Sequence, residues 1–129
     1  MRERIQSELD IVRNEYGDLE TGPDGDWLKI KNFKLPPGWN KEKVKLLILI
    51  PSGYPATPPD NFYVDNSLRL ANGNLPGATS ANKNKLGEPW LQFSYHVEKS
   101  DWSPHADILH GHNLLTFLKG AEERLSEVS

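Results

Sequence analysis

Ser94 and His96 are the residues whose types and spacing in this chain best suit chemistry. A serine hydroxyl is a weak nucleophile unless a neighbouring base takes its proton. Histidine suits this task because its unperturbed pKa lies close to neutral pH. In an extended segment residues i and i+2 point to the same side, so both side chains can face solvent together. The pair therefore predicts a serine nucleophile with its own general base.

The same two residues also fit the polar face of an exposed strand. Along residues 90–96 the apolar Leu91 and Phe93, which are expected to point inward, alternate with polar side chains that point outward. A Ser-x-His sequence is common by chance, and a catalytic histidine usually has a third residue that orients it. Asp101 or Glu98 could orient the imidazole only if the chain bends back. This alternative, a strand surface without chemistry, stays open.

Five further residues lie near the pair in the sequence. Asn82 and Asn84 could each supply a side-chain amide that stabilises an oxyanion. Asparagine is also common in such segments because it tolerates the left-handed conformation and forms Asx turns. Trp90, Trp102 and Pro104 are expected to be structural, with the two tryptophans as packing anchors.

The histidines His105, His110 and His112 raise the question of a metal site. We expect His110 and His112 to lie on a helix, where residues two apart face about 200° apart and cannot share a metal ion. The chain has no cysteine, which excludes disulfides, thiolate ligands and cysteine nucleophiles. The sequence therefore predicts no metal and no cofactor.

Composition limits the classes of function. The 129 residues fit one domain, 1–129, with a sizeable core. The net charge of −3 and the scattered Lys and Arg argue against nucleic acid as a partner. The N-terminus is charged from its second residue and has no apolar segment like that of a signal peptide, and the longest apolar run, Leu46–Pro51, is too short to cross a membrane. We expect a cytoplasmic protein without membrane contact.

The elements that must position the pair follow an α+β order. Ile5, Leu9, Val12 and Tyr16 have helical spacing, and Gly17 is placed to end that helix. The remaining expected elements are a turn at 20–26, a strand at 27–35 with a bulge or bend near Phe33, strands at 43–50 and 62–64, a long irregular loop at 66–89 and a helix at 107–128. Gly111 and Gly120 weaken the helix propensity of the last segment.

A proline-rich segment leads from the second strand to the third. Pro51, Pro55, Pro58 and Pro59 fall within nine residues, so the chain must leave the sheet along a fixed path, and Tyr54 with these prolines is expected to fix a turn. Further on, Trp102-Ser103-Pro104 lies eight residues after Ser94.

With these pieces in order, the chain resembles the ubiquitin-conjugating (UBC) superfamily over nearly its whole length. Residues 54–59, Tyr-Pro-Ala-Thr-Pro-Pro, are similar to the family's YPxxPP turn, and residues 102–104 to the Trp-Ser-Pro that follows its active site. In that family the catalytic cysteine lies eight residues before this tryptophan, which is the position of Ser94. The family's His-Pro-Asn triplet is absent, as in bacterial relatives encoded beside a ubiquitin-like protein, an activating enzyme and a peptidase.

The resemblance implies a UBC-like fold and a function in conjugation. Ser94 would carry the C-terminus of a ubiquitin-like modifier as an oxyester, received from an activating enzyme that uses ATP. The edge formed by Tyr54, Pro55, Pro58 and Pro59 would meet partner proteins, as it meets ligases in the family. An operon-encoded peptidase is a further expected partner.

Two alternatives remain open at this stage. The chain could be a non-catalytic UBC-like module that binds the modifier or the activating enzyme. It could also be an engineered cysteine-to-serine form of a thioester-forming enzyme, which the codon for residue 94 in the encoding gene would decide. Native serine is favoured because an engineered form would keep the His-Pro-Asn triplet.

Overall fold

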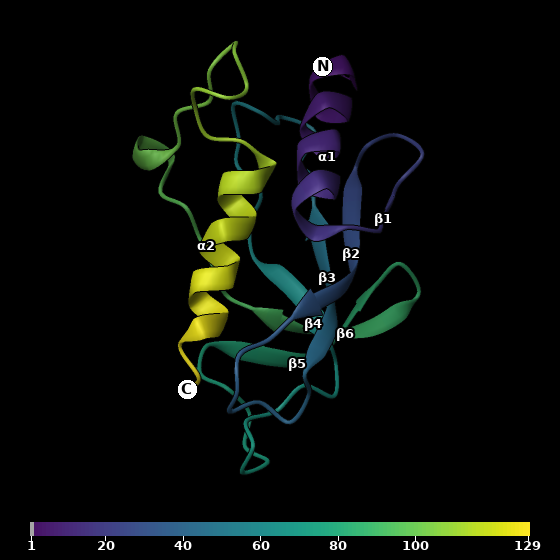
Figure 1. Ribbon diagram of the computed structural model, residues 1–129, viewed down its shortest axis with the longest axis vertical. Coiled ribbons are helices and arrows are strands. Elements are labelled where there is room, and N and C mark those ends of the chain that lie inside the picture. The colour runs from purple at the N-terminus through teal and green to yellow at the C-terminus, as the bar shows by residue number, and fades with distance from the viewer. Residues whose placement is uncertain (1) are drawn as a thin grey trace.

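The computed structural model describes residues 2–129, in which one helix precedes a six-stranded antiparallel sheet and another follows it (Figure 1). The sheet order is β1-β2-β3-β4-β6-β5, so the first four strands form a meander and β6 lies between β4 and β5. This confirms the expected α+β, UBC-like architecture. The elements are α1 (Arg2–Tyr16), β1 (Leu19–Thr21), β2 (Trp27–Lys34), β3 (Lys43–Leu49), β4 (Phe62–Asp65), β5 (Thr79–Lys85), β6 (Glu88–Phe93), the 3₁₀ helix η1 (Lys99–Asp101) and α2 (Leu114–Ser126).

The first half of the chain follows the sequence pattern closely. α1 buries Ile5, Leu9 and Val12 and ends directly before Gly17, which has φ +81° and donates its N–H to Arg13 O at 2.8 Å. The expected irregularity in β2 is present as a register shift between Ile30 and Phe33. The short strand β1 lies in a segment for which the sequence predicts only a turn.

β3 has apolar residues on both faces, as expected for a covered central strand. Leu46 and Ile48 are fully buried in the main core, and Leu47 packs on the opposite face with Tyr63 and Trp90. On this opposite face Lys29 and Lys45 lie over the Trp90 ring, with Nζ 5.6 and 5.1 Å from its centroid.

The prediction that residues 66–89 form one irregular loop is wrong for its second half. β5 and β6 form a hairpin in which Lys85 pairs with Glu88, and the two turn residues Leu86 and Gly87 have φ +53° and +77°. Positive φ at both positions is typical of the primed turns that match strand twist. β5 is a polar edge strand, and so it lacks the apolar alternation by which strands are recognised.

The prediction that the second helix begins near Asp107 is also wrong. α2 begins after Asn113, whose Oδ1 accepts a hydrogen bond from Thr116 N at 3.0 Å while Thr116 Oγ1 accepts one from Asn113 N at 2.9 Å. This reciprocal pair is a capping box, which satisfies N–H groups that the first helical turn leaves free. Residues 102–113 form a loop, so His110 and His112 do not lie on a helix.

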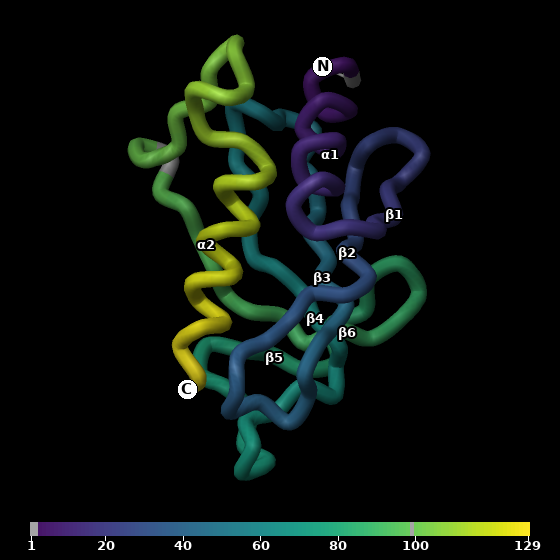
Figure 2. Tube along the Cα trace, viewed as in Figure 1, coloured from purple at the N-terminus to yellow at the C-terminus, as the bar shows by residue number. Residues whose placement is uncertain are grey.

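Both helices begin at the same end of the molecule and lie over one face of the sheet (Figure 2). The main core fills the space between them and the sheet. Its buried side chains include Ile5, Leu9 and Val12 from α1, Leu28, Ile30, Leu46, Ile48, Phe62, Val64, Leu91 and Phe93 from the sheet, and Leu114, Phe117, Leu118, Ala121 and Leu125 from α2. Neither helix in residues 2–129 is long and apolar enough to cross a membrane.

Candidate functional site

Ser94 is the first residue after β6, and its side chain is exposed. Its backbone N–H donates to Ala78 O at 2.9 Å, which ties it to the residue before β5. Leu91 and Phe93 are fully buried in the main core. The alternation along β6 therefore directs Ser94 away from this core.

Tyr95, between the two candidate residues, packs inward against the core. Its ring makes edge-to-face contacts with Phe62 and Phe117, at centroid distances of 5.9 and 5.3 Å. A Cβ atom built on Gly120 of α2 would lie only 1.9 Å from Tyr95 Oη, so the ring occupies space that the glycine leaves open. Burial, with a smaller contribution from Glu123, raises the pKa of the Tyr95 phenol. Tyr95 thus anchors to the core the segment that carries Ser94 and His96, both of which are exposed.

Asn61 holds the backbone of the same tyrosine from the other side. Its N–H donates to Tyr95 O at 2.8 Å and its Oδ1 accepts from Tyr95 N at 3.2 Å. Asn61 has φ +63°, a left-handed conformation that asparagine adopts more readily than most residues. Next to these two residues, Asp60 Oδ1 contacts His96 Nδ1 within hydrogen-bond distance.

Sequence reasoning missed Asp60 as a partner of His96. It considered Asp101 and Glu98, which are close in the chain, whereas Asp60 is 36 positions away. No signal in the sequence marks this contact, because it depends on the pairing of β4 with β6: Asp60 lies just before β4 and His96 just after β6.

The structure does not join Ser94 directly to His96. Within residues 2–129, no hydrogen bond links Ser94 Oγ to the imidazole, although both side chains reach solvent. Catalytic hydrogen bonds are often long in free enzymes and shorten when substrate binds. The arrangement consists of the exposed hydroxyl of Ser94, the imidazole of His96 two residues away, and the carboxylate of Asp60 in contact with that imidazole.

Asn82 and Asn84 lie elsewhere on the hairpin. Asn82 has φ +61° and makes two reciprocal 2.8 Å hydrogen bonds with Asn66, one through its side-chain Oδ1 and one through its backbone N–H. Asn84 pairs with Pro89, which is five residues before Ser94 and so about 17 Å away along the strand. The fold does not bring Asn84 to the exposed serine.

The proline-rich turn is fixed by buried polar contacts. Tyr54 is fully buried, the Tyr54–Pro55 peptide bond is cis, and the tyrosine hydroxyl donates to Glu8 Oε1. The same carboxylate, also fully buried, accepts hydrogen bonds from Leu114 N and Arg4 Nε, both at 2.7 Å. Burial, followed by the hydrogen bond and charge of Glu8, raises the pKa of Tyr54 far above its usual range. Glu8 therefore links α1, the turn and the start of α2.

The remaining residues of this edge differ in exposure. Pro59 is buried, and Pro55 and Pro58 are partly buried. Because Tyr54 is buried too, the exposed surface of the turn consists mainly of Ala56 and Thr57.

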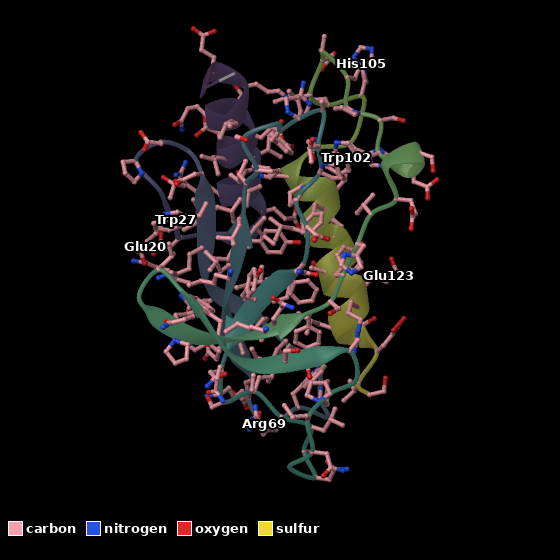
Figure 3. The ribbon with its side chains drawn as sticks, turned by 180° about the vertical axis from the view of Figure 1, so that it is seen from behind. Glu20, Trp27, Arg69, Trp102, His105 and Glu123 are labelled. Atoms are coloured by element: carbon pink, nitrogen blue, oxygen red, sulfur yellow. The ribbon has the colours of Figure 1, made fainter. Side chains whose placement is uncertain are left out.

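Both tryptophans near the site are buried. Trp90 Nε1 donates to Lys85 O at 3.0 Å on the opposite face of the sheet. Trp102 Nε1 donates to Pro55 O at 2.7 Å, and its ring stacks on His112 at 5.3 Å. Partly buried Pro104 follows, and Figure 3 shows Trp102 and His105 at the end of the molecule where α1 begins. The loop from Trp102 is thereby attached to the proline-rich turn.

The histidines of the loop make local contacts. His105 Nδ1 accepts a hydrogen bond from Asp107 N at 2.9 Å, and His112 Nδ1 accepts one from Ser103 N at 2.8 Å. Among the residues that the structure describes, no group of three or more His, Asp or Glu side chains could hold a metal ion.

A helix, a six-stranded antiparallel sheet that begins as a meander, and a closing helix define a UBC-like fold. Residues 7–127 match the model of the prokaryotic E2 family E, and the chain belongs to this family. No curated protein and no solved structure shows significant similarity to it. Membership in this family places the chain among the bacterial enzymes of ubiquitin-like conjugation. Such enzymes are transferases that interact with a ubiquitin-like modifier and its activating enzyme.

Proposed function

We propose that this protein carries the C-terminal acyl group of a ubiquitin-like modifier as an oxyester on Ser94. Ser94 Oγ attacks the activated carbonyl carbon, a C–O bond forms, and the bond between that carbon and the activating enzyme's leaving group breaks. The hydroxyl proton passes to His96 and from there to the leaving group. An acceptor nucleophile then forms a bond to the same carbon, the bond between that carbon and Ser94 Oγ breaks, and the proton that the acceptor loses passes to Ser94 Oγ.

The observation that carries this proposal is the exposure of Ser94 and His96 on either side of the anchored Tyr95. Two residues of extended chain separate Cβ atoms by about 7 Å, a gap that an imidazole can bridge directly or through one water. His96 provides the base that a serine needs, since a hydroxyl is a poor nucleophile without one.

The resemblance to bacterial relatives supports the remaining components of the proposal. The activating enzyme uses ATP, an operon-encoded peptidase is a further partner, the reaction takes place in the cytoplasm, and the protein itself needs no cofactor. The exposed part of the turn at residues 54–59 is the proposed contact for partner proteins. We do not include Asn82 or Asn84 in the chemistry, because Asn84 is distant from Ser94 and the side chain of Asn82 is tied to Asn66 by the hydrogen bond that its Oδ1 accepts.

The test is a reconstituted reaction with the activating enzyme, ATP and modifier, followed by mass spectrometry. We expect an adduct on Ser94 that survives thiol reductant and is cleaved by hydroxylamine or alkali. Ser94→Ala should abolish it, and Ser100→Ala, at another exposed serine, should not. Ser94→Cys should give an adduct that reductant cleaves. A reductant-sensitive adduct on the wild-type protein, or an intact adduct on Ser94→Ala, contradicts the proposal.

A second candidate is a non-catalytic module that holds the modifier or the activating enzyme. It is favoured by one observation, that no hydrogen bond joins Ser94 Oγ to His96 in the described part of the chain. This candidate predicts saturable binding that Ser94→Ala leaves unchanged and no covalent adduct in the reconstituted reaction. Calorimetric titration of the wild-type protein and of Ser94→Ala, with the modifier and with the activating enzyme, would distinguish the two candidate functions.

A further inference from the structure

We infer that Asp60 is the positioning residue for His96: it accepts a hydrogen bond from Nδ1–H of the imidazole and so leaves Nε2 free to take the proton of Ser94. The inference rests on the proposed function for its catalytic consequence. The contact between Asp60 and His96 is independent of that function.

The chemistry of the two groups fixes the direction of this hydrogen bond. An ionised carboxylate is an acceptor only, and a neutral imidazole carries one proton, on either Nδ1 or Nε2. Because Asp60 Oδ1 contacts Nδ1, the proton of a neutral ring stays on Nδ1. The nitrogen with the free lone pair is then Nε2, at the far side of the ring from Asp60. A carboxylate on a histidine base orients the ring and stabilises the imidazolium that forms.

The backbone on both sides holds the two residues together. Asn61 binds Tyr95 through two hydrogen bonds, at 2.8 and 3.2 Å, so the residues before Asn61 and after Tyr95 become neighbours. Buried Pro59 restricts the chain directly before Asp60. Tyr95 itself is fixed against α2 at Gly120. The side chains that must meet are therefore placed by rigid, local structure.

Exposure suggests that the role of Asp60 is functional more than stabilising. The side chains of His96 and Asp60 are 62% and 67% exposed, and exposed ion pairs contribute little to folding. Asp60 can consequently be changed without loss of the fold, which allows a clean test. A carboxylate in water also orients a ring less firmly than a buried one, so its removal should cost less than the factor of about 10⁴ seen in a buried triad.

The experiment compares Asp60→Ala, Asp60→Glu and a control, Asp101→Asn, which changes an exposed carboxylate close to His96 in the chain that has no hydrogen bond to it. The ¹⁵N NMR spectrum of the free protein, recorded where the imidazole is neutral, reports the tautomer of His96. We expect the Nδ1–H form in the wild type, in Asp60→Glu and in Asp101→Asn, and a shift toward the Nε2–H form in Asp60→Ala.

The second measurement is the single-turnover rate of Ser94 adduct formation. Asp60→Ala should slow it by roughly 10-fold to 100-fold, the range seen for partners that orient a metal-ligating histidine, and Asp60→Glu should restore part of the rate. An unchanged tautomer in Asp60→Ala, or a changed tautomer with an unchanged rate, overturns the inference. A tautomer shift in a protein that forms no Ser94 adduct would instead refute the proposed function and leave the Asp60–His96 contact established.

Discussion

The phenol of Tyr95 occupies the space that the missing side chain of Gly120 leaves on α2. A Cβ atom at position 120 would lie 1.9 Å from Oη and 2.9 Å from Cζ of the tyrosine, closer than real contacts allow. A glycine inside a helix normally costs stability. Here it allows the segment that carries Ser94 and His96 to be anchored between the sheet and α2.

The first prediction is that Gly120→Ala destabilises the protein. Alanine alone should stabilise the helix by about 1 kcal/mol, whereas overpacking against Tyr95 costs about 1–3 kcal/mol. We expect a net decrease of up to about 2 kcal/mol in the free energy of unfolding and slower adduct formation on Ser94. Urea denaturation and the single-turnover assay measure the two effects.

The control for this steric argument is Tyr95→Phe, which removes the atom nearest to the added Cβ. The double variant Gly120→Ala/Tyr95→Phe should lose less stability than the sum of the two single changes, because the variants share one contact. Full additivity, or a Gly120→Ala protein that is more stable than the wild type, would contradict the proposed fit of the ring against α2.

The second prediction concerns the start of α2. Asn113→Ala removes the side-chain oxygen of the capping box and the 2.7 Å hydrogen bond from Asn113 Nδ2 to Ile108 O. Loss of an N-cap costs about 0.5–2 kcal/mol. Asp107→Ala, six residues earlier in the exposed loop, should cost less, because no helix begins there. Urea denaturation of both variants tests the boundary, and an equal or larger effect at Asp107 would contradict it.

The first helix and three strands, α1, β2, β3 and β4, could be predicted from the sequence because burial imposes their pattern. Ile5, Leu9 and Val12 recur with helical spacing in α1, and Leu46 and Ile48 alternate in β3, since each of these residues is buried on one face. The bulge in β2 was visible because the apolar phase changes between Ile30 and Phe33. Packing against one core leaves this signature in any chain.

Two elements could not be read from the sequence, for different reasons. β5 is a polar edge strand, and its turn at Leu86-Gly87 lacks the Asn-Gly or Asp-Gly that usually marks a two-residue hairpin. The start of α2 was misplaced because Ile108, in the preceding loop, fits the helical spacing by chance, whereas the cap depends on the side chain of Asn113. Local hydrogen bonds and turn geometry determine these boundaries, and the periodicity of apolar residues does not reveal them.

The candidate site, too, was predictable only where burial sets the pattern. The outward direction of Ser94 follows from the alternation with Leu91 and Phe93, which are fully buried. Asp60 was not predictable, because its contact with His96 requires β4 to pair with β6, although β5 lies between them in the chain. A contact between residues so far apart belongs to the tertiary structure, and no local pattern marks it.

The last prediction uses the buried contact between Tyr54 and Glu8. The folded state raises the pKa of Tyr54 far above the value of about 10 expected in the unfolded chain, first through burial and then through Glu8. A raised pKa in the folded state gives stability that is fully present below pH 10 and is lost as the pH rises, because only the unfolded chain then releases the proton. The loss is about 1.4 kcal/mol per pH unit for each such tyrosine.

Tyr54→Phe should therefore weaken the dependence of stability on alkaline pH. The variant loses the hydrogen bond to Glu8, so it starts less stable at pH 8, but between pH 10 and 11 it should lose about 1 kcal/mol less than the wild type. The pKa values of Tyr16, Tyr63 and Tyr95 are also raised, so part of the alkaline loss persists in the variant. Urea denaturation at pH 8, 10 and 11 measures the difference, and parallel stability curves for the two proteins would show that Tyr54 ionises as readily in the folded state as in the unfolded one.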